Sequence, residues 1–196
     1  MEIVAQNQPS LDAPGAGLPV VELFLARILF GRFRKRNTPD TIDETIRRER
    51  EAILDLVGPL EEAAGRTPVL INRIRGMEDS SRNWSVFMTL EHLRIVNESV
   101  SRTMKALSRC EVPSQRASTA DVKPSVGAGA EAIEGFRASC DGLISSFGEI
   151  TDSKRRETFD HPWFGPLGIR DWHAMAAFHL SLHRRQIESI LKKLNS

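Results

Sequence analysis

The stretch "FHLSLHRRQI", residues 178–187, carries two histidines, His179 and His183, four positions apart. Four residues make about one turn of an α-helix, so both side chains point to the same side of it. The flanking residues extend this face in steps of three and four, which is typical of a packed helix. The predicted face consists of Trp172, Met175, Ala176, His179, His183, Gln186 and Ile190. We therefore expect one helix over residues 169–194.

Helical patterns recur through the rest of the chain. The clearest start is "NTPDTIDE", where Thr38 is a candidate cap and Pro39 takes the first helical position of a helix to about Val57. Further helical periodicity covers residues 18–33, 59–76 (with a kink or break at Pro68), 84–107 and 127–147. No segment alternates as a strand does. The sequence thus predicts an all-α fold, a four-helix bundle with an extra N-terminal helix.

The composition along the chain predicts a division into three parts. Residues 1–17 are rich in Pro, Gly, Gln and Ala, which predicts a loose tail. Residues 18–37 form an N-terminal helix with a basic segment, and residues 38–196 form the bundle domain. The basic run "RFRKR", residues 32–36, is typical of a solvated helix end, where cations are favoured. A contact with anionic lipid, phosphate or a partner is the alternative.

Composition also limits the class of protein. The 27 basic and 26 acidic residues leave a net charge of +1, which argues against nucleic-acid binding. Two cysteines, Cys110 and Cys140, make no disulfide framework, and we expect both thiols to be inert. The apolar stretch from Leu18 to Gly31 is too short and too charged to span a membrane, and it lacks a signal-peptide leader. A soluble cytoplasmic protein is expected.

The two histidines lie where an aliphatic side chain would pack at lower cost. Buried imidazole nitrogens need partners, so the pair is either two satisfied core residues or part of a metal site. His92 is a third imidazole on the apolar face of the helix predicted over residues 84–107. Packing of the two helices would bring all three together. Three imidazoles suit Zn²⁺ or Ni²⁺ and leave coordination positions open for water or a ligand.

Several motifs of known enzymes are absent. The residues between the two histidines are Leu180, Ser181 and Leu182, so the segment is not the HExxH motif of zinc proteases. The chain has no G-x-S-x-G elbow, no P-loop and no dinucleotide fingerprint. Sequence motifs therefore assign no catalytic residue.

Three segments in order resemble one family. "NWSVFMTLEHL" (83–93), "HPWFGPLGIRDW" (161–172) and "FHLSLHRRQI" together look like the DinB-like superfamily of four-helix-bundle metalloproteins, including its YfiT-like metal-dependent members. The resemblance covers roughly residues 40–194. It implies that the three metal ligands are His92, His179 and His183, the same residues that the packing argument selects.

The chain departs from that family's pattern at two positions. Met88 stands where an acidic or amide residue is common, three positions after Ser85, which weakens the prediction of a helix cap at Ser85. Gly168 stands where the last helix often begins with Thr. The ligand assignment is unaffected by either change.

The resemblance also implies a function class. Members with known activities include thiol-dependent transferases and isomerases that use a metal and a small thiol, such as glutathione or a sugar-linked thiol. Together with the three imidazoles, it leads us to expect a metal-dependent thiol transferase or hydrolase acting on a small molecule, with Zn or Ni as the metal and a low-molecular-weight thiol as a candidate cofactor. Related bundles commonly pair, so a homodimer is expected. A non-catalytic metal-binding or stress-related interaction module remains the alternative.

Four other residues lie near the predicted ligands in the sequence pattern. Gln186 and Ser99 share helix faces with the ligands and are candidates for contacting them or the substrate. His161 is expected to anchor the loop before the last helix, with a place at the mouth of the site as the alternative. His173 is expected to face away from the metal, because it lies about 120° around the helix from His179.

Overall fold

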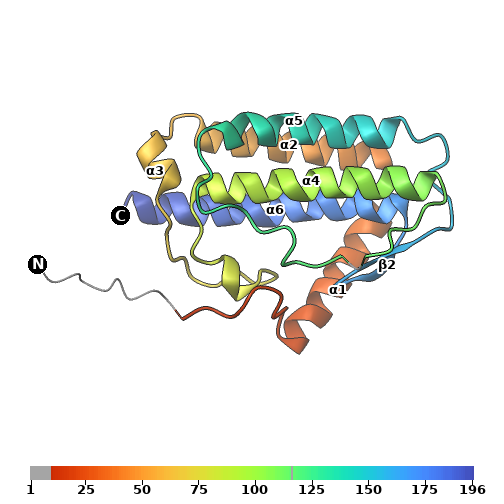
Figure 1. Ribbon diagram of the computed structural model, residues 1–196, viewed down its shortest axis with the longest axis horizontal. Helices are drawn as coiled ribbons and strands as arrows, with labels where there is room; N and C mark the ends of the chain where they lie inside the picture. Colours follow the sequence, from red (N-terminus) through yellow and green to blue (C-terminus); the bar gives the residue numbers. More distant parts are fainter. Residues whose placement is uncertain (1–9, 116) are drawn as a thin grey trace, which may run out of the picture.

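Four long helices form the body of the molecule. The computed structural model describes residues 10–115 and 117–196. Helix α4 (Val86–Ser108) packs on α5 (Glu131–Gly148) and on α6 (Ile169–Leu194), and α2 (Pro39–Val57) closes the bundle by packing on the same two helices (Figure 1). The prediction of an all-α four-helix bundle with an extra N-terminal helix is confirmed.

Local signals set the helix starts. The Thr38 hydroxyl accepts a hydrogen bond from the Thr41 amide, and Pro39 occupies the first position of α2, as predicted. Ser85 caps α4, because its hydroxyl accepts a hydrogen bond from the Met88 amide at 3.1 Å. The presence of Met88, where the family often has an acidic or amide residue, therefore does not remove the cap. The side chain at that position is not needed for the bond that Ser85 makes.

The core lies between the four helices. Its largest fully buried side chains include Ile46, Phe87, Leu93, Phe136 and Leu143. Each such side chain stabilises the fold by about 1.5–3 kcal/mol through removal of apolar area from water. The short helix α3 (Glu62–Arg66) packs at one end of α4, where a Cβ atom at Gly65 would lie 2.3 Å from the Phe87 ring. Only glycine permits this close approach.

The N-terminal helix α1 (Val20–Arg36) crosses the bundle at an angle and packs on α6 (Figure 1). Its buried Phe30 ring lies 4.5 Å from Phe164 and 5.7 Å from Phe178, measured between ring centroids. The basic run 32–36 ends the helix, and Arg34 pairs with Asp171 at 3.0 Å. Several apolar side chains on α1 remain exposed, namely Val20, Val21, Phe24, Leu25, Ile28 and Leu29.

The proposed tail is only partly described. Residues 1–9 lie outside the described part of the chain, and residues 10–17 contain no helix or strand. The amides of Asp12 and Gly15 nevertheless donate hydrogen bonds to Asp79 and Glu78. The division of the chain after residues 17 and 37 stays a prediction.

The segment over residues 59–76 differs from the helix that its periodicity predicts. After α3 the chain becomes extended, and the amides of Val69 and Ile71 donate to the carbonyls of Trp84 and Arg82. Pro68 explains the change, because it has no amide hydrogen and its ring clashes with a preceding helical turn. A short 3₁₀ helix, η1 (Asp79–Ser81), precedes α4.

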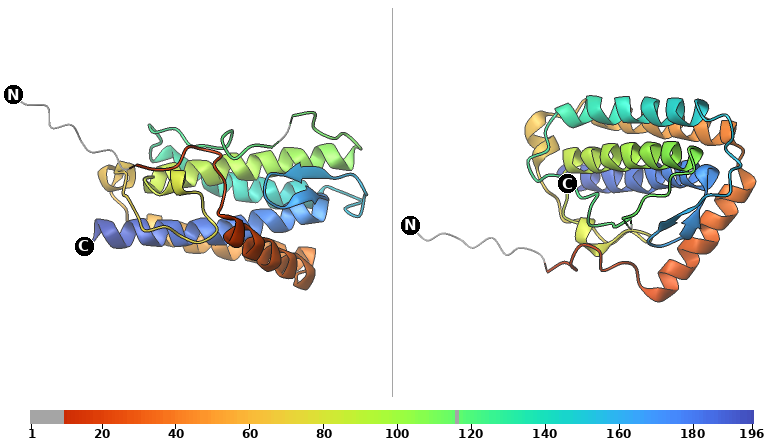
Figure 2. Two further views of the ribbon diagram at one scale, coloured as in Figure 1. Left: turned by 90° about the horizontal axis from the view of Figure 1, so that it is seen from below. Right: turned by 45° about the vertical axis from the view of Figure 1, so that its right-hand side comes forward.

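A β-hairpin lies in the connection before α6, where no strand was expected. Strand β1 (Phe159–His161) pairs antiparallel with β2 (Gly165–Leu167), beside the C-terminal half of α1 (Figure 2). Strands of three residues are too short to show alternation. Gly165 has φ +71°, a conformation that glycine adopts without strain, and Leu167 is buried. The hairpin thus depends on a turn and on one anchored side chain.

Among the described residues, no helix is long and apolar enough to cross a membrane. Both cysteines are free, as expected: Cys140 is buried in the core, and Cys110 is exposed. Burial raises the pKa of the Cys140 thiol to about 12. Its thiolate is therefore strongly disfavoured at neutral pH.

Candidate metal centre

Two antiparallel helices bring three histidines together. His92 comes from the second turn of α4, and His179 and His183 come from the middle of α6. One ring nitrogen from each residue lies within 4.8 Å of the other two. The Nε2 atoms of His92 and His179 are 3.1 Å apart. The structure thus juxtaposes the three residues that the sequence selected as ligands.

The linker after α4 orients the His92 ring. The carbonyl oxygen of Val122 lies 2.6 Å from His92 Nδ1. A carbonyl only accepts hydrogen bonds, so Nδ1 carries the proton and Nε2 keeps a free lone pair. A neutral imidazole in this tautomer is the form that binds a metal through Nε2.

A relay from the loop before α4 orients His183 in the same way. The side-chain nitrogen of Gln186 donates to the Ser81 carbonyl at 2.7 Å, which fixes the orientation of the amide. Its oxygen then faces His183 Nδ1 at 2.6 Å and accepts the proton of that nitrogen. Nε2 of His183 is left with its lone pair. Gln186 is completely buried, so the relay is shielded from water.

His179 is the least constrained of the three. It is partly exposed, and its Nδ1 is a buried atom without a hydrogen-bond partner among the described residues. Burial, with the neighbouring imidazoles, holds the pKa of His179 well below its usual value. Burial likewise lowers the pKa of His183 well below its usual value and that of His92 to about 4. All three rings are neutral at pH 7, as metal binding requires.

The donor set fits a divalent ion. Zinc–nitrogen bonds of about 2.0–2.1 Å place two tetrahedral ligand atoms about 3.2–3.4 Å apart. The separation of 3.1 Å between His92 Nε2 and His179 Nε2 is close to this value. Within the described part of the chain, no carboxylate or thiol joins the cluster. The set therefore supplies three nitrogen ligands and leaves the remaining positions to water or a small molecule.

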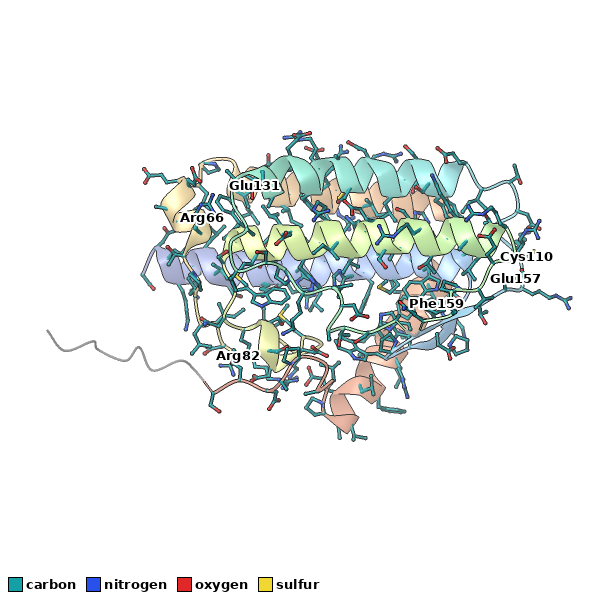
Figure 3. The ribbon with its side chains drawn as sticks, in the orientation of Figure 1. Arg66, Arg82, Cys110, Glu131, Glu157 and Phe159 are labelled. Atoms are coloured by element: carbon teal, nitrogen blue, oxygen red, sulfur yellow. The ribbon has the colours of Figure 1, made fainter. Side chains whose placement is uncertain are left out.

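A cavity of about 700 Å³ opens beside the cluster. Helices α4 and α6 form one wall of the cavity. The other walls come from α1, the hairpin and the linker after α4, which all lie on the same side of the bundle in Figure 2. Phe159 of β1, labelled in Figure 3, belongs to the hairpin wall. The volume lies in the range of small-molecule sites, about 300–1,000 Å³. The histidine faces thus look into a ligand-sized space as well as toward the bundle core.

The other predicted contact residues divide into two groups. Gln186 contacts His183 directly, as described above. Ser99 lines the cavity, but within the described residues it makes no hydrogen bond to the three histidines. His161 lines the cavity too, and its Nδ1 accepts the Trp163 amide at 3.1 Å. It therefore anchors the turn of the hairpin and also faces the cavity.

His173 lies on another face of α6. Its ring stacks on Phe147 of α5 at 4.0 Å, and its Nε2 is 2.9 Å from Asp43 of α2. The hydrogen-bond geometry of this short contact is poor, because neither atom has a well-aligned partner. Burial lowers the pKa of His173 to about 4. The residue is packed in the core, away from the cluster.

The exposed thiol is also remote from the cluster. Cys110 follows the C-terminus of α4, next to Glu157, at the end of the bundle opposite the start of that helix (Figure 3). His92 lies in the second turn of α4, so about 27 Å of helix separates the two residues. Neither cysteine of this chain is placed to bind the same ion.

Sequence reasoning found one of the three groups that orient the ligands and missed two. Gln186 was predicted as a contact of the ligands, because it shares their helix face, and it does contact His183. Val122 acts through its backbone carbonyl, which every residue has, so no side-chain pattern could mark it. Ser81 also contributes only a carbonyl.

Fold and cluster together define a four-helix-bundle protein with three convergent imidazoles at a ligand-sized cavity. A family model of the DinB superfamily matches residues 26–187. This match spans most of the chain, so the protein belongs to the DinB superfamily. It begins inside α1, earlier than residue 40, where the sequence motifs placed the start of the resemblance.

A solved structure has the same architecture. The crystal structure of TT2238, described as a four-helix bundle protein, superimposes with a TM-score of 0.57 at 22% sequence identity. The likeness covers 77% of this chain and 98% of that chain. At this identity it shows the fold alone. A comparison with curated proteins found no match.

Proposed function

We propose that His92, His179 and His183 hold a divalent metal ion, Zn²⁺ or Ni²⁺, and that the protein is a metal-dependent enzyme. The reaction class we favour is transfer of a low-molecular-weight thiol, or hydrolysis, on a small-molecule substrate. One observation carries the proposal: three neutral imidazoles, two of them with their lone pairs fixed toward the cluster, stand at the edge of a cavity of about 700 Å³.

A bound divalent ion would lower the pKa of a water or thiol at its open position, which supplies a nucleophile at neutral pH. The chain's own residues provide the rest. Val122 and Gln186 keep the His92 and His183 rings neutral and oriented. Trp84, 5.0 Å from His92 between ring centroids, covers the cluster with apolar surface. The aromatic walls of the cavity exclude bulk water from the substrate.

One observation favours a non-catalytic module instead. The cavity has two carboxylates, Glu22 and Glu78, and both are already engaged by other groups. Neither is a ready general base. A protein that binds its ligand without turnover would have this arrangement, as would an enzyme whose bound ion supplies the nucleophile without a carboxylate base.

The test is metal content together with turnover. We expect untagged protein to retain close to one metal ion per chain by mass spectrometry, and His183→Ala to retain none. His173→Gln is the matched control, because it removes a buried histidine of the same helix that is not in the cluster. Glutathione with monobromobimane, and p-nitrophenyl acetate, are the substrates for a first screen. Metal retention by His183→Ala would contradict the proposal, and metal binding without any turnover would favour the non-catalytic module.

The homodimer also remains a proposal. The exposed apolar side chains of α1, among them Val21, Phe24 and Ile28, support it, because an apolar helix face is commonly covered by another surface. Light scattering gives the molar mass of the wild type and of Phe24→Glu. A dimeric wild type and a monomeric variant would support the homodimer, and monomers in both cases would contradict it.

A further inference from the structure

The charged residues of the cavity are mostly cations without partners. Its lining includes Lys123 and four arginines, namely Arg32, Arg36, Arg75 and Arg185. None of the five forms an ion pair with any residue in the described part of the chain, where the ion pairs involve other arginines and lysines. This is a local excess, because the whole chain has a net charge of only +1.

The two acidic groups of the cavity form no ion pair with these cations. Glu22 pairs with Arg73 at 2.6 Å and also accepts the Gly76 amide. Glu78 accepts the Thr119 hydroxyl at 2.8 Å and the Gly15 amide at 3.3 Å. Glu22 is therefore neutralised by Arg73, whereas Glu78 lies near enough to act on the pKa of Lys123 without forming an ion pair with it. The cavity presents positive charge to whatever enters it.

Lys123 differs from the four arginines in depth. The arginines are exposed, so water and salt screen their charge. Lys123 is partly buried and follows Val122, whose carbonyl contacts His92. Its charge is near enough to act on the His92 imidazole, and burial lowers the pKa of its own ammonium group. Glu78 is a nearby carboxylate but forms no ion pair with this ammonium group, so an anionic ligand in the cavity can supply a closer counter-charge.

Most of the remaining wall is apolar. It includes Leu25, Leu29 and Phe33 of α1, Trp163 and Phe164 of the hairpin turn, and Phe178 of α6. Leu25 and Leu29 remain half exposed although they face the cavity. A carbon skeleton lying against them would remove this apolar area from water.

We propose that the cavity binds an apolar organic anion, with its carbon skeleton against α1 and the hairpin and its anionic group at Lys123. The proposal deepens the proposed function and rests on it in one respect: the anion would be the substrate of the metal site. Lys123 is then a positioning residue, which holds the charged end of the substrate near the imidazole cluster.

Two fluorescent probes that differ by one charge test this. Anilinonaphthalene sulfonate is an apolar anion, and phenylnaphthylamine has the same aromatic skeleton without the sulfonate. We expect the full-length protein to bind the anion more tightly, with one site per chain. In Lys123→Gln the dissociation constant of the anion should rise by about tenfold, the value of one charged hydrogen bond, while that of the neutral probe stays the same. The unchanged neutral probe also shows that the variant is folded.

Two further variants complete the test. Lys192→Gln removes an exposed cation at the end of α6 and should change neither constant. Leu29→Gln should raise the dissociation constants of both probes by about threefold or more, because it removes apolar area from the wall of the cavity. Equal affinity for the two probes in the wild type, or an unchanged constant for the anion in Lys123→Gln, would overturn the proposal.

Metal content measured on the same samples separates this proposal from the proposed function. A protein that holds no metal but shows the Lys123 effect has an anion-binding cavity and lacks the proposed metal chemistry. A protein that holds one ion and binds both probes equally keeps the metal site, and the assignment of the anion is wrong.

Discussion

Helix α6 carries three buried or partly buried histidines on two faces, and their surroundings differ. His173 faces α2 and α5, where its ring stacks on Phe147 within the apolar core. His179 and His183 face α4, where they meet a third imidazole and a cavity. Burial lowers the pKa of all three, so neither burial nor a shifted pKa distinguishes them. Convergence of lone pairs and space for a ligand are what mark the second face as a site.

The largest expected difference between the two faces is in metal binding. His92→Ala, His179→Ala and His183→Ala each remove one of three ligands, and we expect each to abolish stoichiometric metal retention. His173→Gln should keep the full amount. Elemental analysis after dialysis against a chelator, with circular dichroism to confirm the fold, measures both. Equal loss of metal from His173→Gln would break the comparison.

The core face should dominate stability. Phe136 of α5 is fully buried, and Phe136→Ala should lower the free energy of unfolding by about 3–5 kcal/mol. Metal content should be unchanged in this variant at temperatures where it remains folded. Urea unfolding of the metal-free wild type and variant gives the change in the free energy of unfolding. A loss of metal that matched the loss of stability would show that metal binding depends on the packing of the core.

A smaller effect is expected from the relay that orients His183. Gln186→Met removes both hydrogen bonds of the amide while keeping most of its volume. Loss of such a partner lowers metal affinity by about 10–100-fold. Competition with a zinc-binding dye measures the change. Unaltered affinity would mean that the His183 ring is held by packing alone.

The smallest effect concerns His161, which faces the cavity without joining the cluster. Burial lowers its pKa to about 4, whereas an unfolded chain has a value of about 6.5. The unfolded state therefore binds more protons between these values, and stability falls as the pH drops through 6.5 toward 4. The metal-free wild type should lose stability between pH 7.5 and pH 5.5, and His161 should account for about 1 kcal/mol of that loss. The loss should therefore be smaller by this amount in His161→Phe. Urea unfolding at the two pH values gives this difference, and an unchanged slope would contradict it.

Sequence reasoning reached further for the helices than for their connections. The bounds of α6 and the cap of α2 at Thr38 follow from local periodicity and capping chemistry, which a single sequence displays. The segment over residues 59–76 has helical periodicity, yet Pro68 and the pairing of Val69 and Ile71 with the chain before α4 make it extended. Such pairing depends on tertiary contacts that periodicity does not report.

The same contrast holds within the site. The three imidazoles were visible as unusual side chains on apolar helix faces. The orientation of two of them, His92 and His183, depends on the carbonyls of Val122 and Ser81, in segments that the sequence indicated only as connections. Lys123 shows the limit most clearly, because an isolated lysine in a linker is ordinary until the fold places it in a cavity.

X-ray absorption at the zinc edge of reconstituted protein tests the central claim most directly. The account predicts three imidazole nitrogens at about 2.0–2.1 Å, completed by one or two oxygen atoms at similar distance. Removal of His183 should abolish this signal, and His173→Gln should leave it intact. In buffer without added thiol, a sulfur atom at about 2.3 Å, or a shell of oxygen atoms without imidazole, would contradict the three-histidine centre.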